Sequence, residues 1–216
     1  MSLETDRDVT KAGILGTFKT ARAPVTISRY EVSRSKALEL FSLRGYWQVS
    51  MRDLASHLGL KSGSLYHHFP SKQHLLFELI EEFYEDLRAI SSYCLQSRRD
   101  CEKALRVLIR ARLTLHREHP FHTRLVLREV ESLDEDLRRR IEAMKKQYTL
   151  DLTRLITPPG EAINSRLEGA AHVIAEMLIS LPEWLETHPL SEFERGRIAE
   201  RLVMGALHGL RLQEKA

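Results

Sequence analysis

The segment from Lys61 to His67 brings together residues that can hydrogen-bond nucleic acid. Its polar, small or hydroxyl-bearing members are Lys61, Ser62, Gly63, Ser64, Tyr66 and His67. Lysine and hydroxyl side chains donate to phosphate oxygens, and hydroxyl and imidazole groups can bond the edges of bases. Backbone N–H groups in the first turn of a helix also favour phosphate. The segment is therefore predicted to read a DNA groove, although any short amphipathic helix pair can show a polar face of this kind.

Two short helices joined by a tight turn must position this segment. Ser50 and Asp53, three residues apart, predict a capping box that opens the first helix. Gly59 supplies the positive φ that a sharp reversal needs. Ser62 is expected to cap the second helix, and Pro70 to end it. Two helices around such a turn form a helix-turn-helix. Its inward residues are expected to be Leu38, Phe41, Leu54, Leu58, Leu65, Phe69, Leu75 and Leu76.

A longer string, G-x-L-Y-x-H-F-x-x-K from Gly63 to Lys72, closely resembles the signature of the TetR (tetracycline-repressor) family of transcriptional regulators. Upstream, Ala37, Leu40-Phe41 and Gly45-Tyr46 resemble the first helix of that family and its glycine stop. The resemblance covers residues 28–80, and beyond them only the all-helical layout agrees. It implies a homodimeric DNA-binding regulator, expected to be a repressor that a small-molecule effector releases from a pseudo-palindromic double-stranded operator.

The same resemblance implies roles for single residues. Ser50 and Arg52, at the start of the first motif helix, would touch phosphate or a base edge. Lys61, Ser62, Ser64 and His67 would face the major groove beside Gly63, while Tyr66 and Lys72 would hold phosphates. Ser64 and His67 are the residues expected to read bases.

Charge and cysteine content agree with a DNA-binding N-terminal region. Residues 1–72 contain 11 Lys and Arg against 6 Asp and Glu, whereas residues 73–216 contain 22 against 24. The modest basic excess thus lies with the helix-turn-helix. Cys94 and Cys101 cannot form a disulfide framework, so a reducing cytoplasm is the simplest compartment, with packing favoured over redox sensing. No apolar run approaches the ~20 residues that span a bilayer, so no membrane contact is expected.

Residues 1–27 are interpreted as an N-terminal arm rather than a signal peptide. The apolar stretch Ala12–Phe18 is short and broken by glycine, and acidic residues precede it. Lys11, Lys19 and Arg22 could reach phosphate or a minor groove, and an inert tail is the alternative.

The remaining pattern predicts an all-α fold. One amphipathic helix runs from Ser28 to Gly45, and Ser71 caps a fourth helix that continues to about Ser97. The later helical intervals are Asp100–Glu118, Phe121–Val130, Asp134–Ile156, Glu161–Ser180 and Ser191–Leu212, separated by prolines. We therefore expect a small N-terminal head and a larger helical body. The resemblance implies that the three-helix head, residues 28–74, binds DNA and that residues 75–216 form the ligand-binding and dimerisation domain. The fourth helix would connect them and carry the effector signal.

Other reactive side chains give weaker signals. His116, His119 and His122 form H-x-x-H-x-x-H, but Pro120 is expected to break the helix, so solvated or pocket-lining histidines are favoured over a metal site. No metal or cofactor is predicted. Catalytic motifs such as G-x-S-x-G or H-E-x-x-H do not occur, which disfavours an enzyme. The alternative function is a cytosolic helical ligand carrier or enzyme whose head has little DNA affinity.

In TetR-like proteins a small-molecule pocket lies between the fourth helix and the next three. The residues that the resemblance places there are Phe83, Tyr84, Tyr93, Arg112, His116, Phe121, Arg124, Met144 and Tyr148. Arg112, His116 and Arg124 are the possible polar anchors of a mostly apolar effector, and for each of the aromatic residues and Met144 ordinary core packing is favoured over a pocket role. Trp184, beside Pro182, could close a pocket or cover a helix end.

The last two helices carry apolar or small stripes that predict a four-helix dimer interface. The stripe residues are Ile163, Leu167, Ala170, Ile174, Leu178, Ala199, Leu202, Ala206, Gly209 and Leu210. Burial within one chain is the alternative for either stripe.

Overall fold

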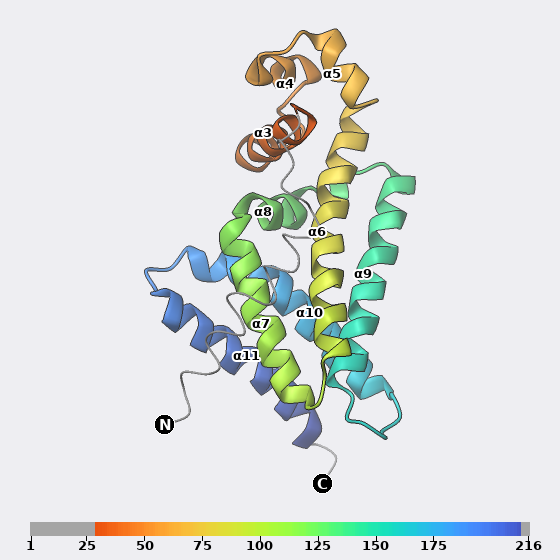
Figure 1. Ribbon diagram of the computed structural model, residues 1–216, viewed down its shortest axis with the longest axis vertical. Coiled ribbons are helices and arrows are strands. Elements are labelled where there is room, and N and C mark those ends of the chain that lie inside the picture. Colours follow the sequence, from red (N-terminus) through yellow and green to blue (C-terminus); the bar gives the residue numbers. More distant parts are fainter. Residues whose placement is uncertain (1–28, 213–216) are drawn as a thin grey trace. The chain divides into compact units, whose positions relative to one another are not determined.

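The computed structural model describes residues 29–212, and all regular structure in this range is helical, which confirms the predicted all-α class. The helices, drawn in Figure 1, are α3 (Arg29–Arg44), α4 (Met51–Leu58), α5 (Ser62–His68), α6 (Lys72–Gln96), α7 (Cys101–Glu118), α8 (Pro120–Glu129), the 3-10 helix η2 (Val130–Ser132), α9 (Glu135–Ile156), α10 (Ser165–Glu186) and α11 (Glu192–Leu212). Within the described range, no helix is long and apolar enough to cross a bilayer.

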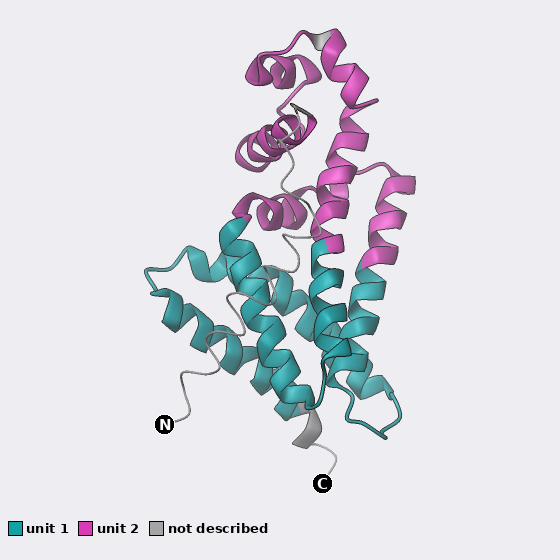
Figure 2. Ribbon diagram, in the orientation of Figure 1, with its two compact units in different colours: residues 1–23, 86–118, 145–216 teal, residues 24–85, 119–144 magenta. Residues whose placement is uncertain are grey.

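The chain divides into two compact units, coloured separately in Figure 2. Among the described residues, the head unit contains 29–85 and 119–144, and the body unit contains 86–118 and 145–212. The long helices α6 and α9 therefore each contribute their first part to the head unit and their second part to the body unit. The boundary predicted from the sequence, between residues 74 and 75, separates a DNA-binding domain from an effector-binding domain. It stays a prediction.

The helix-turn-helix of the head unit forms where the sequence predicts it. Ser50 Oγ accepts from the Asp53 amide at 3.1 Å, and Asp53 Oδ2 accepts from the Ser50 amide at 2.8 Å, so both halves of the capping box are present. Gly59 takes the left-handed conformation with φ 65°, which lets the chain turn directly into α5. Leu54, Leu65 and Phe69 are completely buried beneath the two helices.

Two details of this core differ from the prediction. Ser62 is not the cap of α5, because the helix already begins there and Lys61 occupies the N-cap position without a side-chain hydrogen bond. A lysine carries only donors, so it cannot accept from the first-turn amides. Leu58 is half-buried rather than fully buried.

Hydrogen bonds connect helices α8 and η2 to the rest of the head unit. Ser42 Oγ donates to the Phe121 carbonyl at 2.8 Å. The Tyr46 amide donates to Glu129 Oε1 at 3.1 Å, and Ser132 Oγ donates to Glu129 Oε2 at 2.9 Å. Glu129 is buried, so these two bonds compensate for the loss of water around its carboxylate.

In the body unit, α7, α10 and α11 pack against one another. Ala170, Ala171 and Ala175 are almost completely buried along α10 and leave room for close helix approach. The predicted helix Glu161–Ser180 is wrong at both ends. Asn164 caps α10 by accepting from the Leu167 amide at 3.0 Å, so the helix begins at Ser165.

Helix α10 also continues through Pro182 to Glu186. An interior proline removes one backbone hydrogen bond and costs a helix about 3 kcal/mol. Pro182 and Leu185 are both buried, and the apolar surface that the last turn removes from water offsets this cost. Tertiary packing therefore overrides the local breaker.

Candidate nucleic-acid interface and effector site

The predicted groove-facing residues of α5 lie on an exposed surface. Lys61, Gly63, Ser64, Tyr66 and His67 are exposed, while Leu65 between them is completely buried. The helix thus divides into an inward apolar face and an outward polar face, as the sequence predicts. The side chain of Ser62 lies outside the described residues.

The start of α4 presents Arg52 to solvent, and the capping box fixes the backbone beneath it. Hydrogen bonds from the Ser50 hydroxyl and amide lower the pKa of Asp53 below its usual range, because they stabilise the ionised form of the capping carboxylate. Ser50 is exposed as well, although its hydroxyl already contacts Asp53.

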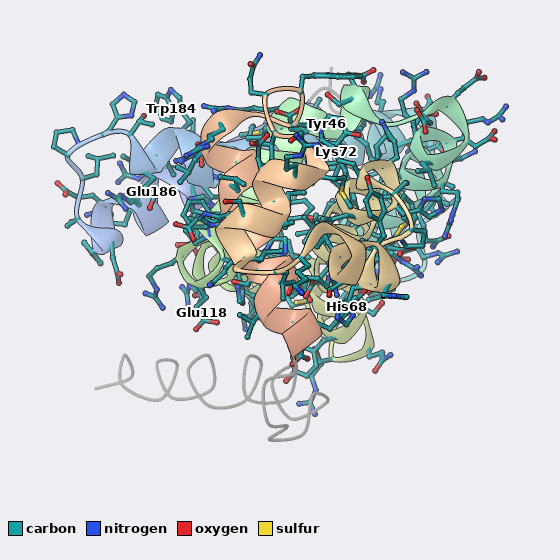
Figure 3. All side chains as sticks on the ribbon, turned by 90° about the horizontal axis from the view of Figure 1, so that it is seen from above. Tyr46, His68, Lys72, Glu118, Trp184 and Glu186 are labelled. Atoms are coloured by element: carbon teal, nitrogen blue, oxygen red, sulfur yellow. The ribbon has the colours of Figure 1, made fainter. Side chains whose placement is uncertain are left out.

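Lys72 is held rather than freely extended. Its Nζ lies 3.8 Å from the centre of the Tyr46 ring, and Figure 3 shows the two labelled residues side by side. The Lys72 side chain is half-buried, and burial lowers its pKa although Glu129 and Asp53 oppose that shift. A cation over an aromatic face keeps its N–H groups available for a further acceptor.

Trp47 is an exposed aromatic residue that the sequence analysis did not single out. It is 72% exposed and lies in the turn between α3 and α4, with its ring 5.3 Å from that of Tyr46. Its place directly after the Gly45 stop and before the Ser50 cap is the signal that could have marked it as a loop residue beside the predicted DNA contacts.

The predicted effector residues are divided between the two units. Tyr93, Arg112, His116 and Tyr148 belong to the body unit. The head unit contains Phe83, Tyr84, Phe121, Arg124 and Met144. Phe83 and Tyr84 are buried with their rings 5.4 Å apart, and Phe121, Arg124 and Met144 are half-buried.

Arg112 and His116 are both buried on α7 in the body unit. Arg112 is 1% exposed, and its Nη2 donates to the Ile179 carbonyl at 3.4 Å. Burial lowers the pKa of Arg112 to about 10, against the opposing effects of Tyr148 and Asp86. The pKa of His116 is lowered by burial and by the charge of Arg112, while His116 Nε2 lies 3.0 Å from Glu186 Oε2.

A small cavity of about 10 Å³ adjoins Arg112 in the body unit. It lies among α7, α10 and α11, and its lining residues are Ile109, Arg112, Leu113, Leu178, Leu181, Pro182, Ala199 and Val203. Arg112 alone among the predicted effector residues lines it. The cavity has room for roughly one water molecule.

The other reactive residues are placed as follows. Helix α7 ends at Glu118 and Pro120 is the first residue of α8, so the expected helix break is confirmed, but His119 lies in the break rather than on the helix of His116. His122 Nε2 lies 3.8 Å from Glu82 Oε2 in the head unit. Cys94 and Cys101 are buried free thiols, and burial raises the pKa of Cys94 to about 12. Lys11, Lys19 and Arg22 of the N-terminal arm lie outside the described residues.

The predicted dimer residues fall into an inward and an outward group. Leu167, Ala170, Ile174, Leu178 and Ala199 are buried within the chain. Ile163 is 48% and Leu202 44% exposed, Gly209 is exposed, and Ala206 is half-buried. The Leu210 side chain lies outside the described residues. Trp184 is 53% exposed, and its ring centre lies 4.5 Å from that of His188.

Two family models match this chain. Residues 34–79 match the bacterial regulatory proteins of the tetR family, and residues 99–210 match the tetracyclin repressor-like C-terminal domain. The second match alone covers about half of the chain. The protein therefore belongs to the TetR family of ligand-responsive, DNA-binding transcriptional regulators, and the alternative of a carrier or enzyme is not favoured.

Individual relatives agree with this assignment. The HTH-type transcriptional repressor KstR2 of Rhodococcus jostii is 45% identical over 51 residues, which are 24% of this chain and 25% of KstR2. The nucleoid occlusion factor SlmA of Klebsiella pneumoniae is 29% identical over 147 residues, which are 59% of this chain and 74% of SlmA. The chain thus matches only about a quarter of the length of KstR2.

Solved structures share the fold. The TetR family transcriptional regulator PfmR from Thermus thermophilus has a TM-score of 0.68 at 23% identity, over 82% of this chain and 97% of PfmR. AibR, in complex with isovaleryl coenzyme A and operator DNA, has a TM-score of 0.65 at 22% identity, over 82% of this chain and 96% of AibR.

Proposed function

We propose that two copies of this protein bind a pseudo-palindromic operator through α5 and repress transcription in the cytoplasm until a small molecule releases them. The observation behind this proposal is that α5 has a buried apolar face and an exposed polar face. Leu65 is fully buried, whereas Ser64 and His67 are exposed on the opposite face. A recognition helix places such residues against base edges in the major groove. Ser64 and His67 then read bases, and Lys61 neutralises phosphate.

Phosphate contacts from the neighbouring elements would fix the register of α5. Arg52 and Ser50 lie at the start of α4, and Tyr66 is 52% exposed on α5. Lys72 is oriented by the Tyr46 ring, so little side-chain entropy remains to be lost when its ammonium meets a phosphate. We add Trp47 to this set, because its side chain is largely exposed in the turn that precedes α4 and its indole N–H is a hydrogen-bond donor.

For the dimer interface, we propose the outward faces of α10 and α11. Val173 is 47% and Leu202 44% exposed on these helices. A Cβ added at Gly169, Gly205 or Gly209 would have no atom of the described chain within 4 Å apart from its own helix backbone and chain neighbours, so helices of a second copy could approach closely there. Such a pairing gives the twofold symmetry that a pseudo-palindromic operator requires.

Light scattering at micromolar concentration tests this interface. The parent protein should be a dimer, and Val173→Glu together with Leu202→Glu should produce monomers because charges would be buried at the contact. Leu127→Glu is the matched control, since Leu127 is similarly exposed at 45% but lies on α8 in the head unit. A monomeric parent protein, or a dimer that survives the double change, would contradict the proposal.

The effector is proposed to enter the body unit between α7, α10 and α11. Ile109, Leu178 and Val203 would contact its apolar part, and Arg112 its anionic end. Because the existing cavity holds about one water, an effector of moderate size must move these helices apart. The displacement would reach the head through α6, which supplies residues to both units. Linkage requires DNA and effector to weaken each other's binding by the same factor.

Selection of genomic fragments by the purified full-length protein tests the function directly. One or a few fragments should be enriched, with an affinity about 10³-fold or more above that for random DNA at the same salt concentration. Equal affinity for selected and random DNA would instead indicate a helical ligand carrier whose head has no operator.

A further inference from the structure

The structure gives His116 different neighbours from those that the histidine triplet suggests. His119 and His122 belong to the head unit, whereas His116 lies in the last turn of α7 in the body unit. There it meets two carboxylates from the last turns of α10. One ligand atom each from His116, Glu183 and Glu186 lie within 4.8 Å of one another. Glu186 is labelled in Figure 3.

We infer that His116, Glu183 and Glu186 form a binding site for a divalent transition-metal ion such as Zn²⁺. Zinc binds histidine nitrogen and carboxylate oxygen at about 2.0–2.2 Å in a tetrahedral arrangement, which sets ligand atoms about 3.4 Å apart. His116 Nε2 and Glu186 Oε2 are already 3.0 Å apart. Glu183 and Glu186 are three residues apart on one face of α10, so rotamer changes are enough to bring the third ligand inward.

The charges around His116, Glu183 and Glu186 favour a bound cation. The C-terminal turn of a helix carries partial negative charge on its carbonyl groups, and cations are stabilised there. Both α7 and α10 end within a few residues of the cluster. Glu183 and Glu186 add two negative charges to these helix ends, whereas Arg112, the cationic neighbour of His116, supplies one positive charge. A divalent ion would reverse the sign of the remaining charge and relieve the repulsion between the carboxylates.

The surroundings also suit metal entry and selection. His116 is 5% exposed and is therefore held by packing, whereas the Glu186 side chain is 42% exposed and opens the cluster to solvent. Three protein ligands leave at least one position for water or for a donor atom of another molecule. An imidazole ligand favours zinc, cobalt or nickel over magnesium and calcium, which prefer all-oxygen sites.

Calorimetric titration of Zn²⁺ into the untagged full-length protein tests this inference. We expect one Zn²⁺ per chain, unaffected by millimolar Mg²⁺. Glu186→Gln and Glu183→Gln should each weaken binding at least 10-fold, because a neutral amide is a poor ligand and even second-shell losses cost 10–100-fold. His116→Ala should abolish the site. His172→Ala is the control, since His172 is exposed on the same helix and lies outside the cluster.

Two further measurements keep the inference falsifiable if His116→Ala fails to fold. Bound Co²⁺ should give a visible absorption band that Glu186→Gln removes, and both Gln variants preserve side-chain shape. The absence of stoichiometric Zn²⁺ binding would overturn the site. So would affinities in Glu183→Gln and Glu186→Gln equal to that of His172→Ala. Neither result depends on the operator, so the proposed regulatory function stands or falls separately.

Discussion

The two units bury charged side chains in contrasting ways. In the head unit, Glu129 is 8% exposed and accepts hydrogen bonds from the Tyr46 amide and the Ser132 hydroxyl, at 3.1 and 2.9 Å. In the body unit, Arg112 is 1% exposed, its bond to the Ile179 carbonyl is 3.4 Å long, and burial lowers its pKa to about 10.

The difference in hydrogen bonding between Glu129 and Arg112 indicates which of the two buried charges stabilises the fold. A carboxylate with short bonds to a backbone amide and a hydroxyl joins two segments, because removing it leaves those donors unsatisfied. A guanidinium whose pKa is lowered mainly by burial costs free energy in the resting protein to the extent that its partners do not offset the loss of water. We therefore expect Glu129 to stabilise the head, and Arg112 to serve the effector binding proposed above.

The largest expected effect on stability is that of Glu129→Ala. The change should lower the free energy of unfolding by about 2–3 kcal/mol, because the Tyr46 amide and Ser132 hydroxyl lose their acceptor in a buried place. Urea unfolding measures it. Glu131→Ala is the control, since the Glu131 side chain is 84% exposed. A loss below about 0.5 kcal/mol would show that Glu129 does not anchor the head.

Arg112→Met should have a smaller effect on stability, within about 1 kcal/mol of the parent in either direction. Methionine keeps an apolar side chain of similar length and removes the desolvation cost of the guanidinium, which offsets the loss of its bond to the Ile179 carbonyl. The same variant should bind its operator normally and lose its response to an anionic effector. Arg110→Met is the control, since the Arg110 side chain is 43% exposed. A loss of 3 kcal/mol or more in the free energy of unfolding would show that Arg112 is a structural residue like Glu129. The two units would then not differ in how they use a buried charge.

The smallest effect is expected for Lys72→Ala, which tests whether this residue of the head unit contacts phosphate. Removing one phosphate neutralisation should weaken binding to specific and random DNA alike, and should lower the slope of log affinity against log salt by about one. Lys146→Ala, an exposed lysine of α9, should leave the slope unchanged. An unchanged slope for Lys72→Ala would mean that its contact with Tyr46 is structural only.

The fold could be predicted closely where local chemistry decides it. Ser50, Asp53, Gly59 and Gly45 set helix ends through hydrogen bonds and backbone conformation within a few residues, and the structure agrees at each. Pro182 was misleading because burial of the last turn of α10, a tertiary effect, outweighs the local penalty.

The sites were predicted unevenly for the same reason. The outward face of α5 follows from helical periodicity, so its residues could be named from the sequence. The grouping of His116 with Glu183 and Glu186 could not, because about 70 residues separate α7 from the end of α10 and no local pattern connects them. The α10 stripe of Leu167, Ala170 and Ile174 was visible, yet periodicity alone cannot say that its partner is α7 and α11 of the same chain.

The most direct test of the account is base preference at the selected operator. His67→Ala and Ser64→Ala should change discrimination among operator base pairs by about 1–3 kcal/mol while leaving affinity for random DNA nearly unchanged. Binding of each variant to a panel of single-base operator substitutions, at one salt concentration, measures this. Equal losses on operator and random DNA for both variants, with the base preference of the parent retained, would contradict the claim that the outward face of α5 reads the sequence.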